Sequence, residues 1–300
     1  MAETMSWLSW SNPVAIWWGF LLAVSAANLA LLLVIRSCYR SGARGAGAFA
    51  IEPLLLLAAA YVFGCAFRSI FPRADVQRIC LFDTVLSSVL VGRSVATVAE
   101  LCFVIQWAIV LRALGKLADS DTAKTVSWLI IPLIMLAEWC SWYAAITTDY
   151  LGNVLENSLW TVTFLLIAVA LLRLAPRFRG PPKAVIAATA AGIAGYLAFM
   201  VTVDVPLYVD RWQAEIADGH AFFGLVAGWH DVAGRWVVVH DFTQWRHEIP
   251  WMSLYFSVAV WASLALAAFP LVAHLLPHYR MRPPDKAARS PPLSIPVGYS

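Results

Sequence analysis

The chain has 300 residues, of which 61% are hydrophobic and only 13% are charged, whereas a soluble domain has about 25% charged residues. This composition excludes an ordinary water-soluble domain and indicates an all-α integral membrane protein. The formal net charge of +3 gives no support for binding nucleic acid.

Seven apolar runs meet or approach the length of about 20 helical residues that crosses a bilayer. They lie at residues 14–35, 53–71, 84–111, 126–146, 154–174, 184–203 and 251–276. We therefore predict a domain of about seven transmembrane helices over residues 1–279, in a plasma membrane or bacterial inner membrane. The first run should remain as a span, because the residues before it carry Glu3 but no Lys or Arg, unlike a cleavable signal. The five cysteines show no CxxC spacing and are interpreted as small core hydrophobes.

Basic residues indicate the orientation of the spans. Fourteen of the 21 Lys and Arg residues follow the first, third, fifth and seventh runs: Arg36, Arg40, Arg44, Arg112, Lys116, Lys124, Arg173, Arg177, Arg179, Lys183, Arg280, Arg282, Lys286 and Arg289. Because cytoplasmic loops are enriched in such residues, we predict an outside N-terminus and a cytoplasmic C-terminus. Residues 280–300 are rich in Pro and cannot bury a core, so we expect a disordered cytoplasmic tail.

Residues 204–250 form an unusually long connection between the sixth and seventh spans, extracytoplasmic in this orientation. Asp204 and Pro206 are typical of an N-cap and a first helical turn. The apolar spacing after them predicts a short amphipathic helix on the outer membrane surface, ending near Gly219. The rest of the segment is rich in aromatic residues and Gly, so it could cover the bundle as a lid or dip into the membrane interface.

Ionisable groups inside spans are costly, at about 2.5 to 3.5 kcal/mol each near the bilayer centre, and are therefore candidates for function. The clearest of them are Arg93, Glu100, Glu138 and Glu156. Arg93 and Glu100 share one helical face with Thr97, because offsets of four and three residues align side chains.

We expect Arg93 to pair with Glu100 or Glu138 in a polar cavity that opens outward beneath residues 204–250. His247 and Glu248 would add catalytic groups from the loop. The alternative is that the buried charges form structural pairs that only fix helix packing.

All six histidines occur in the last 81 residues. His230, His240 and His247 are each followed by an acidic residue, and three such imidazoles could hold zinc, iron or copper. Ordinary loop histidines are the alternative. His274 and His278 lie one helical turn apart, but Pro277 between them favours helix termination.

Several functions can be set aside. A retinal pigment needs a lysine in the last span, but the four lysines, Lys116, Lys124, Lys183 and Lys286, all lie outside the predicted spans. No GxxxxGK[ST] phosphate loop occurs. The spans show no internal repeat of the kind that inverted-repeat transporters carry.

Three functional hypotheses remain. The first is a membrane-embedded enzyme acting on a lipid or other apolar molecule in the outer half of the bilayer, where Arg93 binds an anionic group and the glutamates act as acid or base. The second is a non-catalytic subunit or scaffold whose external loop docks a membrane protein partner. The third is a transporter or channel with a charged path along the third and fourth spans.

Overall fold

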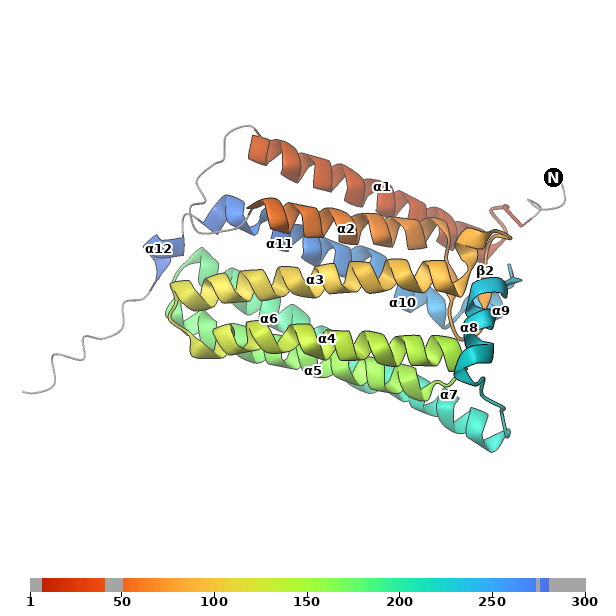
Figure 1. The fold of residues 1–300 in the computed structure, drawn as a ribbon. Helices are drawn as coiled ribbons and strands as arrows, with labels where there is room; N and C mark the ends of the chain where they lie inside the picture. The colour runs from red at the N-terminus through yellow and green to blue at the C-terminus, as the bar shows by residue number, and fades with distance from the viewer. Residues whose placement is uncertain (1–6, 41–50, 274–275, 281–300) are drawn as a thin grey trace, which may run out of the picture.

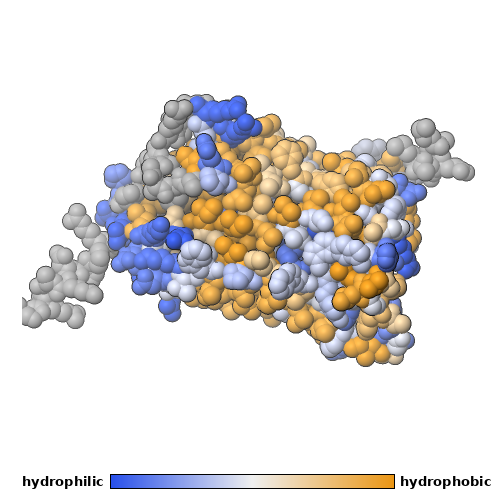
Figure 2. All heavy atoms as spheres, in the orientation of Figure 1, coloured by the Kyte–Doolittle hydropathy of each residue, from blue (hydrophilic) through white to orange (hydrophobic). Residues whose placement is uncertain are grey.

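A computed structural model describes residues 7–40, 51–273 and 276–280, and its long helices lie side by side in one bundle (Figure 1). Within these residues, seven helical segments are long and apolar enough to span a bilayer, so the predicted multi-pass membrane protein is confirmed. The first five are α1 (Pro13–Arg40), α2 (Ile51–Ile70), α3 (Val89–Leu117), α4 (Asp121–Thr147) and α5 (Leu151–Leu174). Large apolar side chains remain exposed along the bundle, including Leu56 at 72% and Trp139 at 70%. Figure 2 shows this apolar flank between two more hydrophilic ends, as a bilayer requires.

The sixth and seventh spans are composite helices. The sixth joins α6 (Pro181–Phe199), the π-helical η4 (Met200–Asp204) and α7 (Val205–Ala217). The seventh joins α10 (Glu248–Leu254), the π-helical η5 (Tyr255–Ala259) and α11 (Val260–Ala273). π-Helical turns are rare and occur frequently at functional sites. Their presence in these two spans makes the region between the spans a candidate site.

The predicted helix after Asp204 is present, but it is not a separate surface helix. It continues α6 without interruption, and Asp204 has helical backbone angles and makes no side-chain cap. The predicted N-cap is therefore wrong, because the π-helical turn carries the chain directly from one helix into the next. The end of the helix is as predicted: α7 stops at Ala217, and Gly219 has the positive φ of 67° typical of a glycine after a helix.

The third span begins later than the apolar run predicts. Thr84 caps a short 3₁₀ turn, η2 (Val85–Ser87), and Ser88 then caps α3 by accepting a hydrogen bond from the Val91 amide. Hydroxyl side chains compete with a continuous helix in this way. The span consequently moves from residue 84 to Val89.

One end of the bundle is covered by the segments between the spans, and we call it the capped end. A hairpin of β1 (Arg73–Ala74) and β2 (Ile79–Cys80) pairs antiparallel, and β3 (Val237–Val238) joins β2 in parallel. This small sheet adds strands that an all-α prediction did not include. Across the ends of α3 and α4 lies α8 (Leu225–Gly234) (Figure 1).

Two contacts hold the cover in place. A Cβ atom at Gly228 of α8 would lie 2.1 Å from the Ile146 carbonyl oxygen, so the close approach depends on glycine. Trp245 of α9 (Phe242–Trp245) is fully buried and packs on Trp17. Residues 220–247 thus fold back onto the bundle, as one of the two sequence-based interpretations expected.

The opposite end, which we call the basic end, carries Arg or Lys at the ends of α1, α3, α4, α5 and α6. The short η3 (Ala175–Arg177) and α12 (Leu276–Tyr279) also lie there (Figure 1). The predicted tail beyond Arg280, and His274, lie outside the described residues. Sequential helices from α1 to α6 pack on their neighbours, whereas α11 packs on α1, α2 and α3. The sixth span therefore lies at the edge of the bundle, against α5.

Candidate functional site

Four of the predicted site residues meet inside the bundle. Arg93 Nη2 lies 3.1 Å from Glu100 Oε2 and 3.0 Å from Glu138 Oε2, and Arg93 Nη1 lies 3.6 Å from Glu156 Oε1. All four side chains are at most 10% exposed. The predicted pairing of Arg93 is confirmed with both partners, and α3, α4 and α5 each supply part of the cluster.

Neutral donors complete this Arg93 cluster. Thr97, one turn from Arg93, donates to Glu138 Oε2 at 2.6 Å, and Trp142 Nε1 donates to Thr97 Oγ1 at 3.1 Å. Asn153 Nδ2 donates to Glu156 Oε2 at 3.1 Å. The shared face of α3 predicted from the sequence therefore points into the bundle, as buried polar groups need partners there.

Asp75, in the β1–β2 hairpin, closes the cluster from the capped end and was not predicted. Its Oδ2 lies 3.9 Å from Arg93 Nη1, and its Oδ1 lies 2.8 Å from Arg73 Nε. A Cβ atom at Gly92 would lie 2.4 Å from the Arg73 side chain, so this glycine makes room for it. Burial alone would raise the pKa of Asp75, but Arg73, Arg68 and Arg93 outweigh it and lower the pKa to about 2. The sequence did carry a signal for this contact, since three charged residues lie close together in one short connection: Arg73, Asp75 and Arg78.

Glu248 does not join the Arg93 cluster. Its Oε1 accepts hydrogen bonds from both terminal nitrogens of Arg211, at 3.1 and 3.2 Å, and from Gln77 Nε2 at 3.2 Å. The Arg211 guanidinium also lies over the rings of Tyr150 and Tyr208, at 5.5 and 5.4 Å. The predicted catalytic Glu248 is therefore part of a second polar cluster, nearer the capped end.

The three histidines proposed as metal ligands lie apart. His240 stacks on Trp7 at 4.2 Å, and its Nε2 lies 2.9 Å from the Leu81 carbonyl oxygen. His230 is exposed on α8, and His247 Nε2 accepts a hydrogen bond from Arg246 Nε at 2.9 Å. Among the described residues, no group of three or more His, Cys, Asp or Glu side chains is arranged to hold a metal ion. The three histidines that the sequence suggested as ligands of one metal ion thus have different neighbours in the fold.

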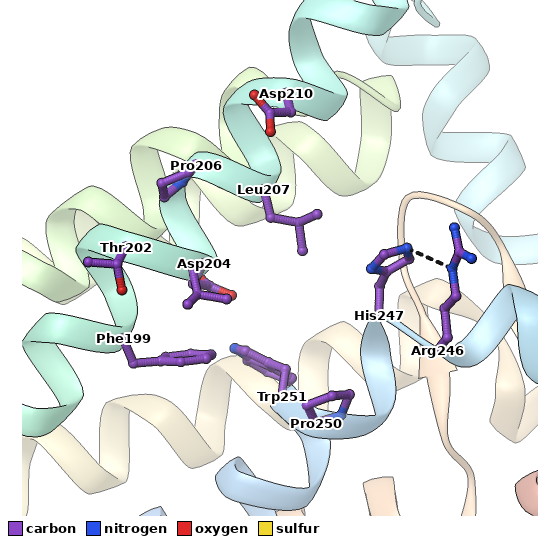
Figure 3. A pocket seen from close by; sticks show the side chains of 11 residues that line it. Phe199, Thr202, Asp204, Pro206, Leu207, Asp210, Arg246, His247, Pro250 and Trp251 are labelled. Atoms are coloured by element: carbon purple, nitrogen blue, oxygen red, sulfur yellow. Dashed lines mark hydrogen bonds between the residues drawn. The ribbon is translucent and has the colours of Figure 1, made fainter.

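A pocket of about 380 Å³ lies between the sixth and seventh spans (Figure 3). Its lining is largely apolar, with five polar side chains: Phe199, Thr202, Val203, Asp204, Pro206, Leu207, Asp210, Arg246, His247, Pro250 and Trp251. Asp204 comes from η4 and points toward Trp251 of α10, while Arg246 and His247 lie at the far side of the opening (Figure 3). Asp204 is 3% exposed, and its Oδ2 has no hydrogen-bond partner. A buried carboxylate oxygen without a partner is costly and needs an explanation.

One side chain links this pocket to the Arg93 cluster. The indole of Trp251, which lines the pocket, stacks on the Tyr255 ring with centroids 4.9 Å apart and planes 10° apart. Tyr255 OH donates to Glu100 Oε1 at 2.9 Å. Tyr255 belongs to η5 and Asp204 belongs to η4, so each of the two π-helical turns supplies one residue to this region. Neither Tyr255 nor Trp251 was predicted, because aromatic residues at span ends usually only anchor the helix.

No protein-family model, curated protein or solved structure matches this chain. Any conclusion about function therefore rests on the side-chain geometry described above.

Proposed function

We propose that this protein is a membrane-embedded enzyme that acts on an amphipathic, lipid-like molecule bound between its sixth and seventh spans. The observation that carries the proposal is Asp204: a buried carboxylate with one unpartnered oxygen, at a pocket whose walls are mostly apolar. Apolar pockets with a few converging polar groups are the usual form of small-molecule sites. Asp204 would act as the acid or base, and His247, which also lines the pocket, would position Arg246 through the hydrogen bond that its Nε2 accepts.

This assignment changes the role that the sequence gave to Arg93. Its guanidinium faces four carboxylates and its side chain is 8% exposed, so a substrate headgroup has no free access to it. Arg246, which lines the pocket, takes over the binding of an anionic or polar headgroup. Glu100 does not line the pocket, but it accepts a hydrogen bond from Tyr255, whose ring stacks on Trp251 in the pocket.

The substrate would enter from the bilayer rather than from water. Phe199, Val203 and Leu207 form the wall from the sixth span, and Val203 is 50% exposed on the surface that faces lipid. An acyl or prenyl chain could therefore follow this wall while its headgroup stays near Arg246. With the basic end in the cytoplasm, as the excess of Lys and Arg favours, the pocket opens in the outer half of the bilayer.

Lipid turnover in nanodiscs tests this proposal. The purified protein is incubated with a total membrane lipid extract, and bound and converted lipids are identified by mass spectrometry. Asp204→Asn should keep the fold but lose product formation by about 100-fold or more, the usual effect of removing an acid–base group. Asp218→Asn, an exposed position outside the pocket, is the matched control. Equal turnover by wild type and Asp204→Asn, or no lipid bound by either, would contradict the proposal.

A second candidate, a non-catalytic subunit, has one specific observation in its favour. Leu225, Val226 and Trp229 of α8 are 66%, 76% and 50% exposed at the capped end, and exposed apolar patches mark interaction surfaces. A membrane protein partner that covers α8 would protect these side chains from water. Co-purification of a stable partner, lost when Val226 is replaced by a charged residue, would support this function over catalysis.

The transporter alternative has less support. Toward the basic end, Gln106 and Ser263 satisfy one another by a hydrogen bond of 2.6 Å. Beyond them the described interior is lined mainly by apolar side chains such as Leu111, Leu114 and Leu171. A polar path across the bundle is therefore interrupted in this half.

A further inference from the structure

The Arg93 cluster contains more acids than bases. Asp75 is balanced by two other buried arginines, Arg73 at 2.8 Å and Arg68 at 4.0 Å. Arg93 is then left to balance Glu100, Glu138 and Glu156, which are 6%, 3% and 10% exposed at their side chains. Two of these three carboxyl groups have no basic partner of their own, and isolated buried charges cost several kcal/mol each. Counting Arg68, Arg73 and Arg93 against the four carboxylates leaves one negative charge in excess, which a single bound cation would neutralise.

A proton fits this requirement better than a metal ion. The Arg93 guanidinium occupies the centre of the cluster and would repel a second cation. In the described part of the chain, these carboxylates also do not form a ligand group that a metal needs. A proton, in contrast, attaches to one carboxyl oxygen and needs no further space.

The geometry of Glu100 and Glu138 indicates where a proton is held. Their Oε2 atoms contact the same nitrogen of Arg93, at 3.1 and 3.0 Å, so the two carboxyl groups lie next to one another. Ionised carboxylates only accept hydrogen bonds, so a bond between them needs a proton on one of them. Independently, Glu138 is 2% exposed and its Oε1 has no hydrogen-bond partner. Protonation of Glu138 would make this unpartnered oxygen neutral, and a neutral buried group costs less than an unpartnered buried anion.

We infer that Glu100 and Glu138 share one proton and form a buried proton-binding site. The other titratable or charged groups around it are Arg93, Arg68, Arg73, Glu156, Asp75, Tyr255, Tyr61, Tyr196 and Cys65. Among them, Tyr255 reaches outward, since its hydroxyl binds Glu100 and its ring stacks on Trp251 at the pocket. The site's role as a proton store for the pocket rests on the proposed function, whereas the shared proton itself does not.

Infrared spectroscopy of the protein in a detergent without ester groups tests the shared proton. Protonated carboxyl groups show a C=O stretching band that ionised carboxylates lack, and that band moves to lower frequency in D₂O. We expect the wild type to show the band at neutral pH, and expect Glu100→Gln and Glu138→Gln each to reduce its intensity. The Asp204→Asn variant serves as background, because a protonated Asp204 would contribute its own band.

Glutamine has the shape of a protonated glutamic acid, so both variants should fold and elute as the wild type does in size-exclusion chromatography. Unchanged band intensity in both folded variants would overturn the inference, and so would the failure of both to fold. The band reports whether a carboxyl group is protonated, and it does so whether or not the protein converts a lipid. A protein that shows the band but converts no lipid would contradict the proposed enzyme and leave the shared proton in place.

Discussion

Replacing Arg93 by Gln tests whether the cluster holds the bundle together. Arg93 contacts carboxylates from α3, α4 and α5 and from the β1–β2 hairpin. The variant would remove the guanidinium from all four carboxylates. Breaking a buried ion pair by removing one partner costs about 3 to 5 kcal/mol. At roughly 2 to 4 °C per kcal/mol for domains of 150 to 250 residues, the apparent Tm should fall by roughly 6 to 20 °C.

The measurement is thermal unfolding in a mild detergent, followed by size-exclusion chromatography of the heated samples. Arg112→Gln is the matched control, because it makes the same change on the same helix at an exposed position, where Arg112 lies over the Trp128 ring. Its cost should be about 1 kcal/mol or less. If Arg93→Gln lowered the Tm no further than Arg112→Gln, the cluster would not stabilise the bundle, and our estimate of buried charge energetics would be refuted here.

Two further predictions concern orientation and acid stability. In a background without reactive native cysteines, a cysteine at exposed His230 should react with a membrane-impermeant maleimide added outside intact cells, whereas one at exposed Asp119, at the basic end, should not; the reverse pattern would invert the orientation. The pKa of Asp75, lowered to about 2, implies about 2 kcal/mol of stability that is present above the unfolded pKa near 4 and is lost as the pH falls toward about 2. Acid unfolding curves of Asp75→Asn should lack this loss between roughly pH 4 and pH 2, and an acid limb equal to the wild type's would contradict the assignment.

The fold was largely predictable because a bilayer imposes a simple rule. A span needs about 20 apolar residues with all backbone groups bonded internally, and each of the seven predicted runs coincides with a helical segment. The rule fails where helices leave the hydrocarbon core. Nothing local distinguishes a new surface helix after Asp204 from a continuation of α6, and the pairing of β3 with β2 joins residues more than 150 positions apart.

The site was predictable only in part, for a related reason. Arg93 and Glu100 lie on one helix, so their common face follows from helical periodicity, and burial then forces them to find partners. Whether Glu138 or Glu156 would be those partners depends on how α4 and α5 rotate, which the sequence does not encode locally. The histidines are the opposite case: proximity along the chain, as at His240 and His247, suggested a common site, but in the structure these side chains have different contacts.

The contrast between the two polar sites is itself an argument about function. The Arg93 cluster is enclosed and its ionic partners face one another, so it can stabilise helix packing and hold a proton without admitting a ligand. Asp204 differs in position: it comes from a π-helical turn and lies at a pocket, where a ligand could reach the oxygen that no protein group satisfies. Natural proteins keep an unsatisfied buried group where binding or catalysis compensates for its cost. Tyr255 connects the two sites through one hydrogen bond and one ring stack. A ligand that moves Trp251 would therefore change the surroundings of Glu100, while the rest of the cluster keeps the helices in place.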